Sequence, residues 1–421
     1  MTNQHKTDVV QDGQPNVVRT LVLLFPAIIA LYGVYQAINQ VLLPAQIVAI
    51  DPTNKVHDTA MASLVESVIG TLILPIGAAI SDRTRSKLGR RAPWLIAMAI
   101  GTAFSCMVMG VVNTIPMVIV MSGVVWFFAN WYQGVVYAVI PDRIPEKDRG
   151  VASSVTGLGL PFGILIFVNI ASRVGQFAGY AIVGGFIVLA TVVFCVFVPD
   201  RSSYDLAHPV TARKERLSWS GIGGFFSAFR HRDFTMAFLS RFAFFFAYFA
   251  IGNFTYYILS DYVGTAHVPG GDVATGVATL STISTIAQIA AIIIFGKVAD
   301  MLDRRKAIVA ISSIVYMIAF IIPLVLPTWG GMLVYSGISG AAAGVYFAVD
   351  IAVMSLVLPD KRNEGRDLGI LAVATSVPAA VAPLLGSTLI GMTGTYASVF
   401  VFGIVLALLG GLFAFLIKSV R

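Results

Sequence analysis

Long apolar runs alternate with short polar connections along almost the whole chain. A helix of about 20 residues spans a hydrocarbon core of roughly 30 Å at 1.5 Å per residue, and most runs reach that length. Runs such as Val183 to Ala190 show no alternation of apolar and polar positions, which excludes a membrane β-barrel. The pattern predicts twelve membrane-spanning helices, at residues 19–49, 57–81, 92–113, 115–140, 150–173, 178–198, 233–261, 272–297, 306–326, 330–357, 368–391 and 394–418.

Composition supports an all-α integral membrane fold. Only 12% of the 421 residues are charged and 57% are hydrophobic, whereas a soluble domain carries about a quarter charged residues. The first 18 residues are polar and lack a cleavage pattern after a short apolar core, so we expect no removable signal peptide. Cys106 and Cys195 fall inside predicted spans without metal-ligand spacing, and we expect neither a metal nor a cofactor.

The basic residues gather in alternate connections. Every Lys and Arg except Lys55, Arg173 and Arg241 lies at a terminus, in the segment 201–232, or in the connection after an even-numbered span. By the positive-inside rule, these connections and both termini are expected to be cytoplasmic in a multi-pass protein of the cell (inner) membrane. The net charge of +7 then reflects topology, and we expect no nucleic-acid partner.

The chain contains an internal repeat. Asp300 lies 218 positions after Asp82, and Pro359 lies the same 218 positions after Pro141, each in the corresponding connection. A shared offset in two connections predicts two pseudo-symmetric six-helix bundles. The expected organisation is a cytoplasmic tail (1–18), an N-terminal bundle (19–200), a cytoplasmic linker (201–232) and a C-terminal bundle (233–421).

The charged connection Asp82-Arg83 followed by Gly89-Arg90-Arg91, echoed at Asp303-Arg304-Arg305, resembles the signature loop of the major facilitator superfamily. The longer string from Ser81 to Trp94 is similar to the glycoside-pentoside-hexuronide cation symporters and the sucrose transporters. The resemblance implies the major facilitator fold, alternating access, a sugar-like solute and proton coupling. The two helix aspartates of sodium-coupled relatives correspond to Gly70 and Leu74, so the family's sodium site is not expected here.

Charged residues at the cytoplasmic ends of the spans are candidates for gating. By pseudo-symmetry, we expect Asp82 to face the start of the span 368–391, and Asp300 the start of 150–173, while the cytoplasmic side is closed. The alternative is that these charges only determine topology. The candidate gating residues are Asp82, Arg83, Arg90, Arg91, Arg149, Asp300, Arg304 and Arg366.

Three ionisable residues lie inside predicted spans, where an unpaired charge costs at least a few kcal/mol: Glu66, Arg241 and Asp350. Asp350 precedes Pro359 by nine residues, or about 13 Å of helix, which places it near the midplane with Tyr346 one turn away. Asp350 is our first candidate for proton coupling, and a structural salt bridge with Arg241 is the alternative. Glu66 either couples protons or lines the path, and Arg241 either pairs or snorkels to the interface.

Polar and aromatic residues recur at three- and four-residue spacing on several apolar spans, which places them on one helix face. Amide and hydroxyl groups beside aromatic rings suit a polyhydroxylated or amphipathic solute, although interhelical hydrogen bonding is the alternative. The candidate substrate-binding residues are Tyr32, Gln36, Asn39, Trp126, Asn130, Gln133, Asn253, Tyr256, Tyr257, Gln288 and Tyr346.

The sequence favours a carrier over an enzyme, because it shows no catalytic Ser-His-Asp set, phosphate loop or metal cluster, and its five His lie at or beyond the span ends. We expect a monomeric secondary active transporter that moves a small organic solute, sugar- or glycoside-like, with proton coupling. The alternative is an exporter of drugs or amphipathic metabolites, because 28 Phe and 13 Met provide enough apolar side chains for an adaptable cavity.

Overall fold

A computed structural model describes residues 17–200, 229–302, 304–357 and 364–418. Most of the expected tail (1–18) and linker (201–232) lies outside these ranges. So do the side chains of Asp300 and Arg366, together with those of Leu302, Ile351, Ala352, Ser355 and residues 364–369.

The N-terminal helices come first. Helix α1 continues through a π-helical segment, Ile38–Leu42, into α2, and α6 continues through another, Ile164–Val168, into α7. The helices are α1 (Val17–Ala37), α2 (Leu43–Ile50), α3 (Lys55–Arg83), α4 (Ala92–Met109), α5 (Ile115–Arg143), α6 (Arg149–Gly163), α7 (Asn169–Ala171) and α8 (Gln176–Phe197).

The C-terminal helices repeat this arrangement, and no strand occurs in the described ranges. They are α10 (Arg232–Gly252), α11 (Thr255–Tyr257), α12 (Val273–Leu302), α13 (Arg305–Val325), α14 (Trp329–Leu356), α15 (Glu364–Thr393) and α16 (Ala397–Phe415). Twelve helical segments of the described chain are long and apolar enough to cross a membrane, which agrees with the predicted number.

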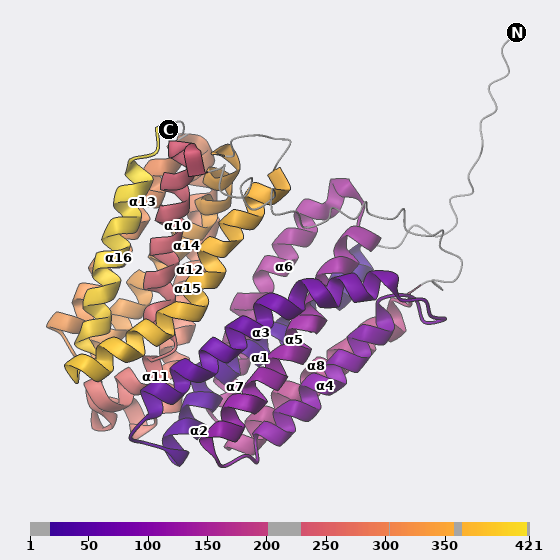
Figure 1. Cartoon of the computed structure of the whole chain (residues 1–421), viewed down its shortest axis with the longest axis horizontal. Coiled ribbons are helices and arrows are strands. Elements are labelled where there is room, and N and C mark those ends of the chain that lie inside the picture. Colours follow the sequence, from indigo (N-terminus) through magenta and orange to yellow (C-terminus); the bar gives the residue numbers. More distant parts are fainter. Residues whose placement is uncertain (1–16, 201–228, 303, 358–363, 419–421) are drawn as a thin grey trace, which may run out of the picture.

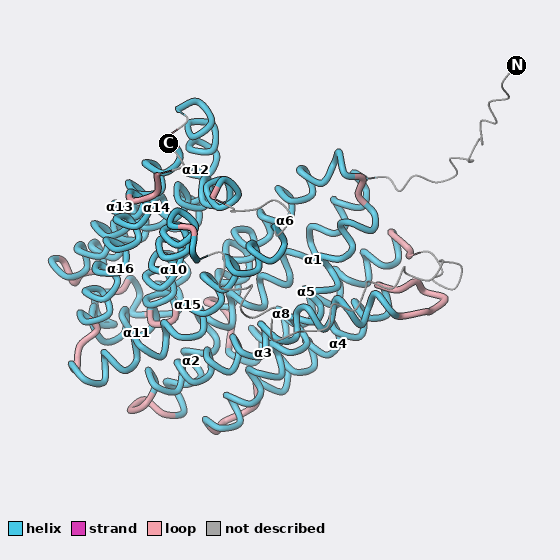
Figure 2. Tube along the Cα trace, turned by 45° about the horizontal axis from the view of Figure 1, so that its top comes forward, coloured by secondary structure: helices cyan, strands magenta, loops and turns pink. Residues whose placement is uncertain are grey.

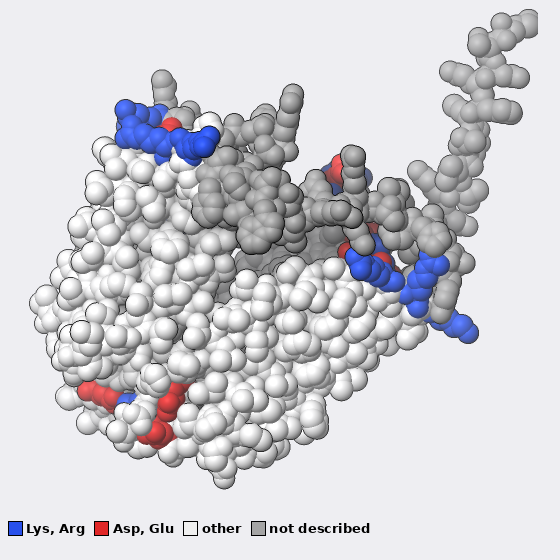
Figure 3. Space-filling view, in the orientation of Figure 1, with Lys and Arg blue, Asp and Glu red and all other residues white. Residues whose placement is uncertain are grey.

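The helices form two bundles, α1–α8 and α10–α16, that meet at one end and diverge toward the other (Figures 1 and 2). We call the diverging end the basic end, because it carries the connection from Arg83 to Arg91 and the residues Arg304 to Lys306. The opposite end, with the connections 51–54 and 265–272, is the far end. On the face shown in Figure 3, charged residues lie at these two ends, and an uncharged belt separates them.

The predicted single helix 233–261 is wrong in its second half. Helix α10 ends at Gly252, and the chain continues through α11 into a π-helical segment, Ile258–Gly264. Glycine is a poor helix former, and here it is followed by Asn253, so the helix breaks where the apolar pattern alone predicts continuation. The other spans begin and end within five residues of the prediction.

Glycines allow some helices of one bundle to approach closely. A Cβ atom on Gly340 of α14 would lie 2.2 Å from the carbonyl oxygen of Ser284 on α12, and one on Gly344 would lie 2.4 Å from that of Gln288. On the same helix, a Cβ on Gly337 would meet nothing closer than 3.8 Å. The positions of Ser284 and Gln288 therefore depend on the absence of side chains at 340 and 344.

We predict that Gly340→Ala lowers the stability of the protein by about 1–3 kcal/mol, because its methyl group would overlap a helix backbone. The measurement is the thermal unfolding midpoint in detergent. Gly337→Ala is the matched control, and it should leave the midpoint unchanged or raise it, since alanine favours the helix. Equal effects of the two substitutions would contradict the close-packing explanation.

Candidate functional site

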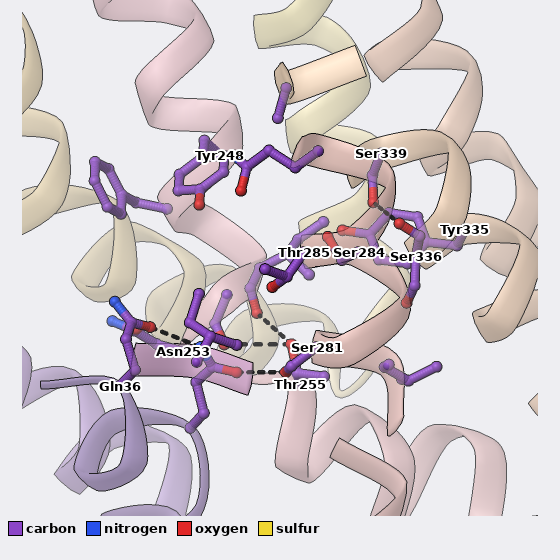
Figure 4. Close-up of a pocket in the computed structure, with 18 of the residues that line it drawn as sticks. Gln36, Tyr248, Asn253, Thr255, Ser281, Ser284, Thr285, Tyr335, Ser336 and Ser339 are labelled. Atoms are coloured by element: carbon purple, nitrogen blue, oxygen red, sulfur yellow. Dashed lines mark hydrogen bonds between the residues drawn. The ribbon is translucent and has the colours of Figure 1, made fainter. Parts of the chain in front are cut away.

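A polar cavity lies between the two bundles (Figure 4). Its volume is about 230 Å³, near the lower limit for small-molecule sites. None of the described residues that line it is charged. They are Gln36, Asn39, Gln40, Ile164, Tyr248, Phe249, Ile251, Gly252, Asn253, Thr255, Leu280, Ser281, Ser284, Thr285, Gln288, Tyr316, Tyr335, Ser336, Ser339 and Ala343.

The two bundles contribute different chemistry to the cavity. The N-terminal bundle supplies three amides, Gln36, Asn39 and Gln40, from one stretch of the first span. The C-terminal bundle supplies Asn253, Gln288, several hydroxyls and the aromatic rings, and Figure 4 shows Tyr335, Ser336 and Ser339 across the cavity from Gln36. The site is therefore rich in neutral hydrogen-bonding groups beside aromatic surfaces.

Four of the predicted substrate-binding residues line this cavity: Gln36, Asn39, Asn253 and Gln288. Asn253 also donates to the Ser63 hydroxyl of α3 at 3.1 Å, and thus joins the two bundles at the cavity edge. The break at the end of α10 puts Asn253 at a helix end rather than within a continuous span.

Two other predicted residues belong to a separate cluster on the N-terminal bundle. The hydroxyls of Tyr32 and Tyr137 are hydrogen bonded, and Gln133 accepts from Tyr35 at 3.0 Å and donates to Tyr137 at 3.3 Å. These side chains are half-buried and do not line the described cavity. Tyr32 and Gln133 are thus placed in an interhelical hydrogen-bond network between α1 and α5.

The remaining predicted substrate residues also lie outside the cavity. Trp126 packs on Tyr35 with ring centroids 5.3 Å apart, and Asn130 donates to the Trp126 carbonyl at 2.9 Å. Tyr256 packs edge-on against the Tyr257 ring. Tyr346 is fully buried and stacks on Phe244.

Several members of the cavity wall were not among the candidate substrate-binding residues. Gln40, Ser281, Ser284 and Thr285 belong to the same polar helix faces as candidates Gln36 and Gln288, whereas the prediction missed Tyr248, Thr255, Tyr316, Tyr335, Ser336 and Ser339. A signal for part of this set was present, since Tyr335, Ser336 and Ser339 share one face of α14 at helical spacing.

The buried pair Arg241–Asp350 lies in the C-terminal bundle on the basic side of the cavity. Arg241 donates to one oxygen of Asp350 and to the Thr375 hydroxyl at 3.1 Å, so it pairs rather than snorkels. Asp350 is 3% exposed, and its other oxygen has no hydrogen-bond partner among the described residues. The hydroxyl of Tyr346, which is the tyrosine beside this carboxyl, likewise lacks a hydrogen-bond partner among the described residues.

Glu66 is the buried acid of the other bundle. It is 2% exposed, with one carboxyl oxygen unpaired among the described residues, and Asn39 and Ser122 are the polar side chains beside it. Because Asn39 lines the cavity, Glu66 lies directly behind the cavity wall.

At the basic end, charged residues are paired within the N-terminal bundle. Arg91 is 5% exposed and pairs with Asp82 and with Asp142, the latter at 2.8 Å, and Arg90 also pairs with Asp142. Asp200, which the prediction missed, accepts from the Arg91 backbone N–H at 3.0 Å and from Arg143 at 2.9 Å. This network ties the ends of α3, α5 and α8 to the start of α4.

The other described gating candidates also make no contact across the bundles. Arg149 donates to the carbonyls of Pro141 and Ile144, each at 3.4 Å, at the end of α5. Arg83 and Arg304 are exposed.

At the far end, side chains join the bundles directly. Lys55 of α3 lies 2.7 Å from the carboxylate of Asp261, which also accepts from Tyr396 at 2.8 Å. Thr59 and Tyr257 are hydrogen bonded at 2.6 Å, and Asn169 donates to Thr282 at 2.8 Å. Ser67 donates to the Ala379 carbonyl at 3.4 Å, between the middles of α3 and α15. The other hydrogen bonds that link described residues of the two bundles lie at the far end or at the cavity, and the structure is closed there.

These observations define a multi-pass membrane protein of the transporter class: twelve membrane-length helices in two bundles, with a polar cavity between them that is closed at one end. The family model of the Major Facilitator Superfamily matches residues 24–278 and 272–421, so the chain belongs to that superfamily. The resemblance seen in the charged loops is confirmed.

Among curated proteins, the chain is 26% identical over 246 residues to the general alpha-glucoside permease of Schizosaccharomyces pombe. The matched region covers 51% of this chain and spans 43% of the permease.

Solved structures resemble the fold at low sequence identity. A bacterial homologue of the human lysosomal transporter Spinster, inward-facing and occupied, matches with a TM-score of 0.71 and 13% identity over 97% of this chain and 98% of that chain. A variant of the nucleoside transporter NupG matches with a TM-score of 0.68 and 13% identity over 94% and 98%.

We predict that the ion pair Lys55–Asp261 favours closure of the far end. Lys55→Ala and Asp261→Asn should each shift the population toward far-end opening by about two- to fivefold, the range of a partly exposed ion pair. Spin labels on Thr53→Cys and Ala266→Cys, exposed on opposite bundles, report the opening by their distance distribution.

The double variant with Lys55→Glu and Asp261→Lys should recover part of the closure, and its failure to do so would contradict the charge-based explanation.

Burial disfavours the ionised form of Asp261, but hydrogen bonds from Lys55, Ser260 and Tyr396 outweigh this effect and lower the pKa of Asp261 below the usual 3.8. The stabilisation is therefore present above that value and is lost only as pH falls through the lowered pKa. The pair's contribution should thus stay constant from about pH 8 to pH 5.

Proposed function

We propose that this protein is a secondary active transporter for an uncharged polyhydroxylated solute of the glycoside class. The observation that carries the proposal is the cavity, which combines amides, hydroxyls and aromatic rings with no charged residue among its described lining. Neutral donors and acceptors satisfy sugar hydroxyls, and aromatic rings pack against the apolar faces of a pyranose. The partial similarity to an alpha-glucoside permease supports the same solute class.

The basic end is cytoplasmic in this proposal, because Lys and Arg collect on the cytoplasmic side of membrane proteins. The bundles are joined at the far end, so the described conformation opens to the cytoplasm. Alternating access then requires the far-end contacts to break while the basic end closes.

We predict that methyl α-glucoside or maltose binds the purified protein and that Gln288→Ala weakens binding about two- to tenfold, the effect of one lost hydrogen bond. Isothermal titration in detergent measures the affinity. Ser313→Ala is the control, because this buried serine of α13 bonds the carbonyl of Val309 on its own helix.

A second solute class is supported by a row of phenylalanines along α10. Phe238 stacks on Phe242, and Phe242 packs on Phe246, so aromatic rings extend from the basic end toward Phe249 in the cavity. Such a surface suits a drug or an amphipathic metabolite. Binding of an uncharged amphiphile, without competition from glycosides, would favour this alternative.

Proton coupling is the second part of the proposal, and Asp350 is its first candidate. A buried carboxyl with one oxygen paired to Arg241 and one unpaired has a site for a proton beside a fixed positive charge. Glu66 and its neighbour Asn39 give the other bundle a second candidate.

We predict that Asp350→Asn abolishes uphill accumulation in proteoliposomes while solute exchange partly persists, because the variant cannot carry the proton. A buried arginine that loses its partner is itself destabilising, so the single variant does not separate coupling from structure. The double variant with Arg241→Gln removes both charges. Recovery of uphill accumulation in this double variant would show that the pair is structural and would remove Asp350 from coupling.

A further inference from the structure

We infer that the solute and the opposite bundle compete for the carboxamide of Gln40. Occupancy of the cavity would therefore weaken the closure of the far end. The inference rests on the proposed function and assigns to Gln40 and Ser281 the task of linking solute binding to opening. Both residues line the cavity, and they belong to different bundles.

The contacts of Gln40 form a chain across the cavity floor. The Ser281 hydroxyl donates to the Gln40 side-chain oxygen, and the Gln40 amide nitrogen donates to Gln36 at 2.6 Å. Figure 4 labels Gln36 and Ser281, the residues at the two ends of this chain. The carboxamide thus uses its oxygen to hold the C-terminal bundle and its nitrogen to hold its neighbour.

The backbone places Gln40 where it can serve both partners. Gln40 lies in the π-helical segment Ile38–Leu42, and Pro44, four residues later, has no N–H to donate to the Gln40 carbonyl. The wider turn breaks the regular helical register at the cavity, and such π segments occur frequently at functional sites. The sequence spacing of Gln40 and Pro44 therefore explains the local distortion.

The solute and Ser281 can compete because both carry hydroxyls that can donate to the side-chain oxygen of Gln40. A carboxamide oxygen has two lone pairs, and the inference is that a solute hydroxyl takes the position that the Ser281 hydroxyl holds, so that Ser281 then turns to the solute or to water. The solute gains a partner while the bundles lose one of their contacts. A ligand shifts a conformational equilibrium only by its differential affinity for the two states, and this exchange supplies such a difference.

The contacts between the bundles at the far end have no such link to the cavity. Lys55–Asp261 and Thr59–Tyr257 lie at the far end, and none of these four residues lines the cavity. Removing either contact should favour opening equally with and without solute. Ser281 differs because its partner also faces the solute.

The test uses the full chain with Cys106→Ala and Cys195→Ala, spin labels at Thr53→Cys and Ala266→Cys, and methyl α-glucoside as the probe. The measured quantity is the far-end-open population without solute and at saturating solute. Ser281→Ala should raise the open population without solute by about two- to tenfold, the effect of one net hydrogen bond. The further increase caused by the solute should shrink toward none.

Thr59→Val is the matched control, because it also removes one hydroxyl that bonds across the bundles, outside the cavity. It should raise the open population without solute, yet keep the full solute response of the unsubstituted protein. If Ser281→Ala keeps that full response as well, the inference is overturned. If the unsubstituted protein does not respond to the glycoside at all, the proposed solute class fails first and the competition at Gln40 fails with it.

Discussion

A polar group inside a lipid bilayer has no water to bind, so it must find a partner in the protein or line a wet cavity, and the structure depends on this constraint. The buried charge of Arg241 is paired with Asp350, and Glu66 lies beside Asn39 and Ser122. The uncharged amides and hydroxyls collect where the two bundles meet. The surface proposed to bind a solute is therefore also the surface that joins the bundles, and neither can change without the other.

The two ends of the molecule satisfy their charges differently. At the far end, Lys55 finds its partner on the other bundle, so the ion pair exists only while that end is closed. At the basic end, Arg91 forms ion pairs with Asp82 and Asp142, and all three residues belong to one bundle. These ion pairs therefore persist when the two bundles move relative to each other as rigid bodies. We expect Asp82 to contact the start of α15 when the basic end closes. Its carboxylate would then bind both α15 and Arg91.

Most of the fold follows from the apolar pattern, because helix length and lipid thickness are matched by simple geometry. The break at Gly252–Asn253 did not follow, since the apolar pattern of 233–261 continues through it. Among the candidate amides, Gln36, Asn39, Asn253 and Gln288 reach the cavity, whereas Asn130 and Gln133 do not. Serines and tyrosines were less so, because their hydroxyls bond helix carbonyls or neighbouring side chains as readily as a solute.

Contacts between residues far apart in the sequence were the other feature that the sequence did not predict. Asp200 lies 109 residues from Arg91, and only folding brings the end of α8 to the start of α4. A glycine marks this contact, since Gly89 has a φ of +86° and a Cβ there would overlap Asp200. A positive φ is a property of the backbone, so the sequence alone does not distinguish this glycine from one used for packing.

The repeat explains the architecture, but the chemistry lies where the two halves differ. The offset of 218 residues aligns Glu66 with Ser284, which lines the cavity, and aligns Asp350 with Tyr132, which bonds Thr191 inside its own bundle. Each half thus carries a buried acid at a position where the other half has a neutral hydroxyl. Both halves present their basic connections at the same end, so exchanging the halves does not exchange the two openings, and a preference for one opening needs no difference between the halves. Proton coupling does need a titratable group, so it must come from positions such as these, where one half has an acid and the other a hydroxyl, rather than from the helices that the halves share.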